Sequence, residues 1–355
     1  MIQHRSFLIK PASWDCNLTC DYCFYKRTAE TYPESGAHRM SDETFEALVE
    51  KAQRDRVQNV SYIWQGGEPM LMGLDFYKRS IEIQETHRKT GQMLTNTIQT
   101  NGVLIDDDWG KFLADHNMLV GISVDGPKNI HDIHRFDHAG NSSFDRVFKA
   151  IDILEKYSVE YNILSVVTAE TAACAKEIYH FFLDRNFHYL QFIDCIEADD
   201  DGPLPFSLSP DAFGKFLCEL FDEWFENGYP YVSIRLFDNI LQYRTGMQPE
   251  CCMYKNNCGA YYVVEYNGDI YPCDFFVRDE WLLGNIHISG LDTFDNHPKH
   301  LEFMKLRSLP HDACEVCDWL GFCQRGCIKS RAFPNGDYGS LNYLCTAYKL
   351  SLIHI

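Results

Sequence analysis

The chain has 355 residues, of which 45% are hydrophobic, and a formal net charge of -19 at pH 7. This length is enough for one large domain and a smaller one, and the negative charge argues against nucleic acid or an anionic membrane as the main partner. The sequence contains no run of eighteen apolar residues and no signal-peptide core, so we expect a soluble, cytoplasmic protein.

Strand-like and helix-like segments alternate through the first two thirds of the chain. Strands are predicted at residues 6–10, 59–64, 94–99, 119–124, 161–167 and 189–194. Helices are predicted at 41–55, with Ser41 as N-cap, and at 74–89, 106–116, 143–157, 175–185 and 211–226. Six strand-then-helix units predict an α/β protein with a parallel sheet, built as a partial (β/α)6 TIM-like barrel.

The amino-acid composition of the sequence changes beyond roughly residue 233. Cysteine, glycine and aromatic residues dominate there, and residues 261–277 are typical of a β-hairpin that turns at Asn267 and Gly268. We therefore predict a barrel domain over residues 1–232 and a small cysteine-rich domain over residues 233–355.

Fifteen cysteines in a chain without an export signal indicate metal or cluster ligation, because the cytosol keeps ordinary thiols reduced. Eleven of them form patterned groups: Cys16, Cys20, Cys23, Cys252, Cys258, Cys273, Cys314, Cys317, Cys323, Cys327 and Cys345.

Polar motifs follow the first four predicted strands. They are CxxxCxxC from Cys16, QGGEP (65–69), QTNG (99–102) and SVDGP (123–127). The C-terminal rim of a parallel barrel is where active sites are built, so we expect these motifs to converge. Gly66 and Gly67 would let a ligand approach the backbone closely, and Glu68 could hold a cationic group there.

The CxxxCxxC motif supplies three thiolates and leaves a fourth position unfilled. A structural zinc site prefers four closed ligands, whereas a [4Fe-4S] cluster on three cysteines keeps one iron open for a substrate or cofactor. The open cluster is the favoured interpretation, with zinc as the alternative.

With an aromatic residue, Tyr22, before its third cysteine, and with GGEP after the second strand, the chain resembles the radical S-adenosylmethionine (SAM) superfamily. That resemblance implies that the open iron chelates SAM and cleaves it to a 5'-deoxyadenosyl radical. SAM would be held by Tyr22, Gly66, Gly67 and Glu68, and further by Ser123, Arg135 and Ile196.

The cysteine-rich region resembles the SPASM extension of radical SAM enzymes that modify peptides. This resemblance implies two auxiliary [4Fe-4S] clusters, three clusters in all. Cys252, Cys258, Cys273 and Cys327 would hold the first auxiliary cluster, and Cys314, Cys317, Cys323 and Cys345 the second. Spacing alone does not establish this crossed pairing, and a zinc ribbon at residues 314–327 is the alternative.

Nearly the whole chain resembles the anaerobic sulfatase-maturating enzymes, through KPASWDCNLTCDYCFY, WQGGEPML, IQTNG, GISVDGPKNIHDIHR, CGAYYVVEYNGDIYPCDFFV and CEVCDWLGFCQRGC. That family oxidises a cysteine or serine of a sulfatase motif to Cα-formylglycine. The resemblance implies Asp274 as the base, Tyr25 and Gln65 as contacts of the substrate peptide, and the auxiliary clusters as the electron exit. The implied partners are an unfolded or nascent sulfatase segment and an electron donor such as flavodoxin or ferredoxin.

Two alternatives remain open from the sequence. One is a radical SAM-SPASM enzyme that forms thioether or other crosslinks in a different ribosomal peptide. The other is a non-catalytic zinc or iron-sulfur module, in which Asp274 would be an ordinary turn residue bonded to backbone N-H groups.

Overall fold

All six predicted strands are present in the computed structural model, which describes residues 4–54, 57–226, 228 and 230–355. They are β1 His4–Lys10, β2 Asn59–Trp64, β3 Met93–Thr100, β4 Leu119–Ser123, β5 Tyr161–Val167 and β6 Tyr189–Asp194. The strand predictions are confirmed, because runs of β-branched and aromatic residues bounded by turn residues form strands here as expected.

The six predicted helices are also present, with small differences at their ends. They are α2 Asp42–Ala52, α3 Leu74–His87, α4 Asp107–Asp115, α6 Phe144–Lys156, α7 Ala175–Asp184 and α8 Pro210–Phe225. The Ser41 hydroxyl accepts a hydrogen bond from the Thr44 N-H at 3.1 Å, as expected of an N-cap. Helix α2 ends at Ala52, earlier than predicted, and Asp55 lies outside the described residues.

The chain forms two compact units that interleave along the sequence. Unit 1 comprises Met1–Ile122, Phe136–Tyr161 and Gly259–Phe303, and unit 2 comprises Ser123–Arg135, Asn162–Cys258 and Met304–Ile355. These units differ from the predicted division at residues 232 and 233, because the predicted hairpin belongs to unit 1. The division into two domains stays a prediction.

In unit 1 the strands follow the order β12-β11-β10-β1-β2-β3-β4. Strands β1 to β4 run parallel. The predicted hairpin is confirmed as β10 Tyr262–Glu265 and β11 Asp269–Tyr271, which pair antiparallel, and β12 Gly284–Asn285 follows. Strand β10 also pairs parallel with β1, in a register that sets Lys10 beside Glu265.

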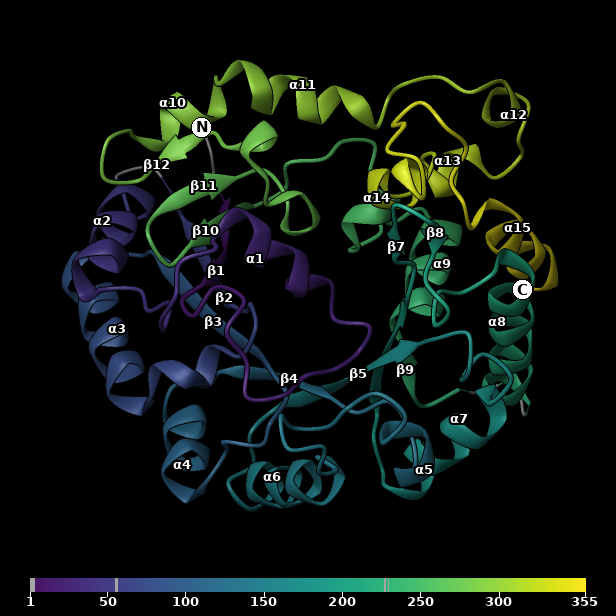
Figure 1. Cartoon of the computed structure of the whole chain (residues 1–355), viewed down its shortest axis with the longest axis horizontal. Helices are drawn as coiled ribbons and strands as arrows, with labels where there is room; N and C mark the ends of the chain where they lie inside the picture. The colour runs from purple at the N-terminus through teal and green to yellow at the C-terminus, as the bar shows by residue number, and fades with distance from the viewer. Residues whose placement is uncertain (1–3, 55–56, 227, 229) are drawn as a thin grey trace. The chain divides into compact units, whose positions relative to one another are not determined.

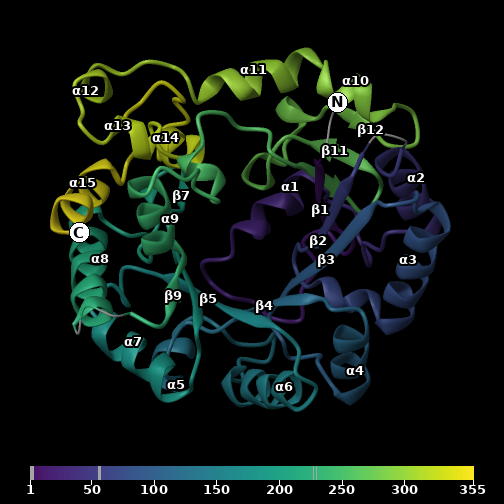
Figure 2. The same ribbon diagram turned by 180° about the vertical axis from the view of Figure 1, so that it is seen from behind.

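Helices α2 and α3 lie outside strands β1 to β3 (Figure 1), and the same strands run side by side when seen from behind (Figure 2). Aromatic rings fill the space between these layers. The Trp64 ring centroid lies 5.0 Å from that of Phe45 and 5.1 Å from that of Tyr77. This apolar packing fixes the strand ends from which the polar motifs emerge.

Unit 2 contains the parallel strands β5, β6 and β9 Ser233–Ile234. Helix α8 packs against the C-terminal helix α15 Cys345–His354, with the Phe213 ring edge-on to Tyr348 at 6.0 Å. Its other elements are short: α5 Lys128–His131, β7 Ala198–Asp199, β8 Gly202–Pro203, α9 Arg235–Arg244, η3 Cys252–Tyr254, α12 Asp312–Glu315, α13 Leu320–Cys323 and α14 Ile328–Ala332.

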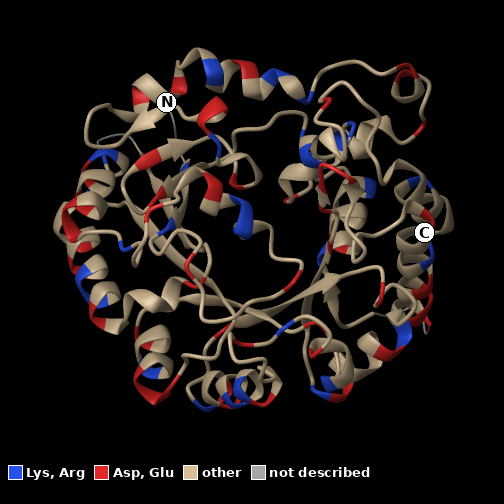
Figure 3. Ribbon diagram, in the orientation of Figure 1, with Lys and Arg blue, Asp and Glu red and all other residues tan. Residues whose placement is uncertain are grey.

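The remaining short elements are η1 Phe24–Arg27, α1 Thr28–Thr31, η2 Pro69–Met72, η4 Asp274–Phe276, η5 Asp279–Trp281, α10 Leu291–Asp295 and α11 Pro298–Leu306. Charged residues of both signs alternate along α2 and α3 (Figure 3). Within the described part of the chain, no helix is long and apolar enough to cross a membrane.

Candidate active site

The loop after β1 carries the three cysteines of the CxxxCxxC motif. Its backbone turns tightly, with the Cys23 N-H donating to the Cys20 carbonyl at 3.3 Å. Burial raises the pKa of the Cys16 thiol to about 12, and the charges of Glu68, Cys20 and Cys23 add to that increase. The three thiols are thus close enough to interact electrostatically, as ligands of one cluster must be.

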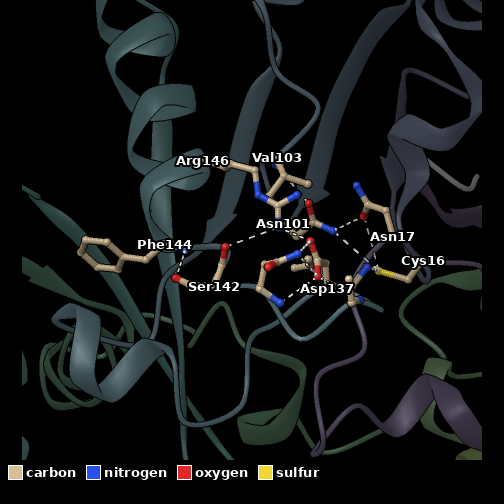
Figure 4. A network of polar contacts seen from close by, with 11 residues as sticks. Cys16, Asn17, Asn101, Val103, Asp137, Ser142, Phe144 and Arg146 are labelled. Carbon is tan, nitrogen blue, oxygen red and sulfur yellow. Dashed lines mark hydrogen bonds and ion pairs between the residues drawn. The ribbon is translucent and has the colours of Figure 1, made fainter.

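Two neighbouring segments hold this cysteine loop in place (Figure 4). The Asn101 side-chain amide, at the end of β3, donates to Asn17 Oδ1 at 2.8 Å and to Cys16 Sγ at 3.6 Å. The second segment follows β4: the Thr19 N-H donates to the Phe136 carbonyl at 2.9 Å, and His138 Nε2 lies 3.0 Å from the Cys16 carbonyl oxygen. The QTNG motif was identified from the sequence, but no contact between Asn101 and the cysteine loop was predicted.

The glycines of QGGEP let the end of β2 touch the backbone of the cysteine loop. The Gly67 N-H donates to the Ser13 carbonyl at 2.7 Å, and a Cβ placed on Gly67 would lie 2.1 Å from the Asp15 carbonyl oxygen. A side chain cannot fit there. Gly66 and Gly67 were predicted to let a ligand approach the backbone closely. In this structure the backbone of the cysteine loop makes such an approach.

Glu68 makes its hydrogen bonds within the protein. Its side chain is 0% exposed, and its carboxylate accepts hydrogen bonds from Met70 N-H, Thr100 Oγ1 and Asn101 N-H at 2.8 to 2.9 Å. Burial raises the pKa of Glu68 to about 7, although these hydrogen bonds oppose the increase. Glu68 thus joins the ends of β2 and β3, and its predicted contact with SAM stays a prediction.

The predicted base, Asp274, lies directly after Cys273 and is 6% exposed. Tyr25 Oη donates a hydrogen bond to Asp274 Oδ2 at 2.7 Å. On the other oxygen, Lys10 Nζ makes an ion pair with Asp274 Oδ1 at 2.7 Å. The predicted residues Tyr25 and Asp274 are thus in direct contact, and the carboxylate is held from both sides.

Lys10 and Glu265 were not identified from the sequence. Lys10 is 0% exposed at the end of β1, and its Nζ lies 3.7 Å from Glu265 Oε1 and 4.3 Å from the centroid of the Tyr25 ring. Lys10 therefore faces two carboxylates, those of Glu265 and Asp274. This buried group contains two acidic side chains and one basic side chain. The sequence shows only that each of these two charged residues ends an apolar strand. A charged residue at that position is typical of an ordinary strand end and does not indicate a buried ion pair.

Unit 2 contains Ser123, Arg135 and Ile196, which were predicted to contact SAM. Arg135 Nε donates to Asp125 Oδ2 at 2.7 Å, and the other oxygen of Asp125 accepts the Val166 N-H at 2.9 Å. Asp125 thus orients the Arg135 guanidinium and is a further residue that the sequence did not reveal. Ser123 ends β4 and Ile196 is buried. Their contacts with SAM, like that of Tyr22 in unit 1, stay predictions, and so does the contact of Gln65 with the substrate peptide.

The four cysteines predicted for the second auxiliary cluster lie around one cavity. Cys314, Cys317, Cys323 and Cys345 all line it, together with apolar side chains that include Trp319 and Leu320. A [4Fe-4S] cluster needs four thiolates around a space of this kind. The donor set and the cavity therefore fit the cluster.

Three of the four cysteines predicted for the first auxiliary cluster interact in unit 2. Burial raises the pKa of Cys252 to about 11, and the charges of Cys327 and Cys258 contribute to the increase. The fourth predicted ligand, Cys273, belongs to unit 1, so its place in this set stays a prediction. Cys251 is separate, because its sulfur accepts hydrogen bonds from Arg235 at 3.1 Å and Asn239 at 3.5 Å.

Among the residues that the structure describes, no group of three or more His, Cys, Asp or Glu side chains is arranged to hold a single metal ion.

Comparison with known proteins agrees with this geometry. Residues 15–182 match the family model of the radical SAM superfamily, and residues 251–318 match an iron-sulfur cluster-binding domain, SPASM. The cysteine-type anaerobic sulfatase-maturating enzyme of Clostridium perfringens (strain 13 / Type A) is 40% identical over 97% of this chain and 94% of its own.

A serine-type anaerobic sulfatase-maturating enzyme of Bacteroides thetaiotaomicron is 36% identical over 98% of this chain and 88% of its own. The solved structure of native anSMEcpe with bound AdoMet and Cp18Cys peptide superposes with a TM-score of 0.91 and 39% identity. That superposition covers 99% of this chain and 96% of the other, which confirms the predicted fold class.

Proposed function

The chain belongs to the anaerobic sulfatase-maturating enzymes of the radical SAM superfamily, and from this premise we propose that it oxidises a cysteine or serine of a sulfatase motif to Cα-formylglycine. The relatives of both substrate types match nearly the whole chain. The observation that carries the proposal is Asp274, a buried carboxylate held by Lys10 and Tyr25 in the same unit as the cysteine loop.

Cys16, Cys20 and Cys23 hold the cluster that binds SAM, and the cysteines of the SPASM region hold auxiliary clusters. When bound, the reduced first cluster and SAM supply the radical that removes one Cβ hydrogen, and the auxiliary clusters supply the acceptor of the remaining electron. We infer that the two domains divide these tasks as predicted, over residues 1–232 and 233–355.

The residues of this chain then have defined tasks. Asp274 accepts the proton of the substrate thiol or hydroxyl, so that a C=S or C=O double bond can form at Cβ. A thioaldehyde yields the aldehyde by hydrolysis with loss of sulfide. Tyr25 orients Asp274 by its hydrogen bond to Oδ2, and Gln65, half-buried after β2, is placed to seat the peptide backbone or side chain.

The partners follow from this chemistry. The substrate is an unfolded or nascent sulfatase segment, because a folded sulfatase would bury the target residue. A one-electron donor such as flavodoxin or ferredoxin supplies the first cluster. The fifteen cysteines of the chain support a cytoplasmic location, because thiols stay reduced there.

The test is anaerobic incubation of the reconstituted protein with SAM, a reductant and a peptide that carries the sulfatase motif with cysteine or serine at the target position. We expect 5'-deoxyadenosine together with replacement of SH2 by oxygen in the cysteine peptide, or loss of two hydrogens from the serine peptide. Deoxyadenosine with an unchanged peptide would contradict the substrate and direct attention to peptide crosslinking.

A further inference from the structure

A buried arginine lies between the cysteine-bearing loops of unit 2. Arg307 follows α11 and is 2% exposed. Its guanidinium donates to the backbone carbonyls of Cys252 at 2.9 Å and of Gln324 at 3.3 Å, and also to that of Met253. These carbonyls belong to two loops that are distant in sequence, one starting at Cys252 and the other joining Cys323 to Cys327.

The charge of Arg307 has no carboxylate partner in the described part of the chain. The ion pairs of the described residues include Arg325 with Glu315 at 2.7 Å and Lys329 with Glu197 at 2.6 Å, but none to Arg307. Carbonyl oxygens satisfy the N-H groups of a guanidinium without neutralising it. A buried charge without a counter-charge is costly, so an anion is expected beside it.

The candidates for that anion are the thiolates on the two loops that Arg307 holds. One of its acceptors is the carbonyl of Cys252 itself, and another is that of Gln324, which directly follows Cys323 in the loop that ends at Cys327. Cys252 and Cys327 are predicted for the first auxiliary cluster and Cys323 for the second.

We propose that Arg307 is the counter-charge of the first auxiliary cluster and the residue that fixes the two loops of its ligands. The inference rests on the auxiliary clusters of the proposed function, but not on the identity of the peptide. A [4Fe-4S] cluster with four thiolates changes from a charge of -2 to -3 when it accepts one electron. A fixed positive charge close by stabilises the reduced state more than the oxidised one, and so raises the reduction potential.

An arginine suits both tasks. Its planar guanidinium stays charged and presents several N-H donors in a fixed arrangement, whereas a lysine offers a single charged nitrogen. Arg307 is itself held by a second buried arginine, because Arg331 Nη1 donates to the Arg307 carbonyl at 3.2 Å. The charge is therefore fixed in place, as a tuning residue for electron transfer requires.

The test uses the full chain with Cys16, Cys20 and Cys23 replaced by alanine, so that only auxiliary clusters are observed. Iron and sulfide are measured first, and the midpoint potentials are then obtained by dithionite titration followed by electron paramagnetic resonance. Arg307→Gln removes the charge, and Arg307→Lys keeps it without the planar donor set. Arg79→Gln is the matched control, because its charge already has Asp42 as partner at 2.6 Å and its helix α3 carries no cysteine.

We expect Arg307→Gln to lower the reduction equilibrium constant of one auxiliary cluster about tenfold or more, which is about 59 mV for a one-electron couple. Arg307→Lys should keep a potential close to that of the parent, and Arg79→Gln should leave both potentials unchanged. If Arg307→Gln loses a cluster, a normal potential in Arg307→Lys still supports the counter-charge.

An unchanged potential in a fully loaded Arg307→Gln protein would overturn the inference. Equal shifts in Arg307→Lys and Arg307→Gln, or loss of the cluster from both, would assign Arg307 to bracing alone and overturn the counter-charge. A parent protein without iron or sulfide would instead refute the auxiliary clusters themselves, and so the electron exit of the proposed function.

Discussion

Asp274 is held by two partners of different chemical kinds, a phenol and an ammonium group. The phenol of Tyr25 fixes one carboxylate oxygen by a directional hydrogen bond. The Lys10 ammonium supplies an opposite charge at 2.7 Å from the other oxygen, so the carboxylate is held from both sides.

Replacing Asp274 with asparagine should therefore separate radical formation from product formation. We expect Asp274→Asn to keep producing 5'-deoxyadenosine while its rate of formylglycine formation falls about 10²-fold or more, the usual contribution of a general base. Both products are measured in the same reaction by mass spectrometry. Asp279→Asn, at an exposed acid of the same segment, is the control and should match the unmodified protein; a normal product rate in Asp274→Asn would exclude it as the base.

Lys10 should matter for stability as well as for catalysis. Lys10→Met leaves Glu265 and Asp274 buried without their cation, and breaking a buried pair in this way costs about 3 to 5 kcal/mol of unfolding free energy. Lys10→Met with Glu265→Met should be less destabilised, because an apolar pair replaces the second buried charge. Denaturant unfolding of both variants tests this, and equal destabilisation would contradict the pairing of Lys10 with Glu265.

At this scale the sequence predicted those residues that stand in recognisable motifs. Asp274 after Cys273 and Tyr25 after Cys23 were identified, and the structure brings them together. Lys10 was missed because nothing in a sequence shows that a lysine at a strand end is fully buried. The same holds for Asn101, whose contact with Cys16 depends on how two loops fold.

Among the elements, the contact between the end of β2 and the cysteine loop leaves no room for a side chain at Gly67. Gly67→Ala would place its Cβ 2.1 Å from the Asp15 carbonyl oxygen, so the loop backbone must move. We expect loss of the iron held by Cys16, Cys20 and Cys23 and loss of SAM cleavage, as measured by iron content and deoxyadenosine. Gly290→Ala is the control and should behave like the unmodified protein, because its added Cβ would lie at an ordinary 3.5 Å from Arg54 Nη2. Normal iron content and normal SAM cleavage in Gly67→Ala would show that the loop adapts.

Glu68 links β2 to β3 and should give this region a dependence on pH. Burial raises the pKa of Glu68 from 4.5 to about 7, so the folded state binds this proton more tightly than the unfolded state. Its contribution to stability is fully present below pH 4.5 and is lost as the pH rises through about 7. The thermal midpoints of the unmodified protein and of Glu68→Gln should therefore differ in slope over this range, and parallel curves would contradict the assignment.

The elements with regular periodicity were the ones that the sequence predicted. Strands of alternating burial and the Asn-Gly turn of the hairpin carry local signals. The parallel pairing of β10 with β1 carries none, because it joins segments about 250 residues apart through backbone hydrogen bonds. The short helices of the cysteine-rich region, such as α12, α13 and α14, were not predicted either, since four or five residues are too few to show a helical period.

For the whole molecule, the net charge of -19 should act on electron donors. An anionic reductant is repelled and a cationic one attracted, and salt screens both effects within about 10 Å at 0.1 M. We expect SAM cleavage at limiting reductant to speed up with added salt when dithionite is used and to slow down with a reduced viologen. Salt effects of the same sign for both reductants would show that the entry point of electrons does not experience the overall charge.

The interleaving of the two units has a consequence for how the chain is made. Strand β1 is among the first segments to leave the ribosome, yet its partner β10 follows about 250 residues later, which at usual synthesis rates is a delay on the order of ten seconds or more. During that time Lys10 has neither Glu265 nor Asp274 as partner. A chain still in synthesis therefore lacks its base, so formylglycine formation becomes possible only after translation has passed Asp274.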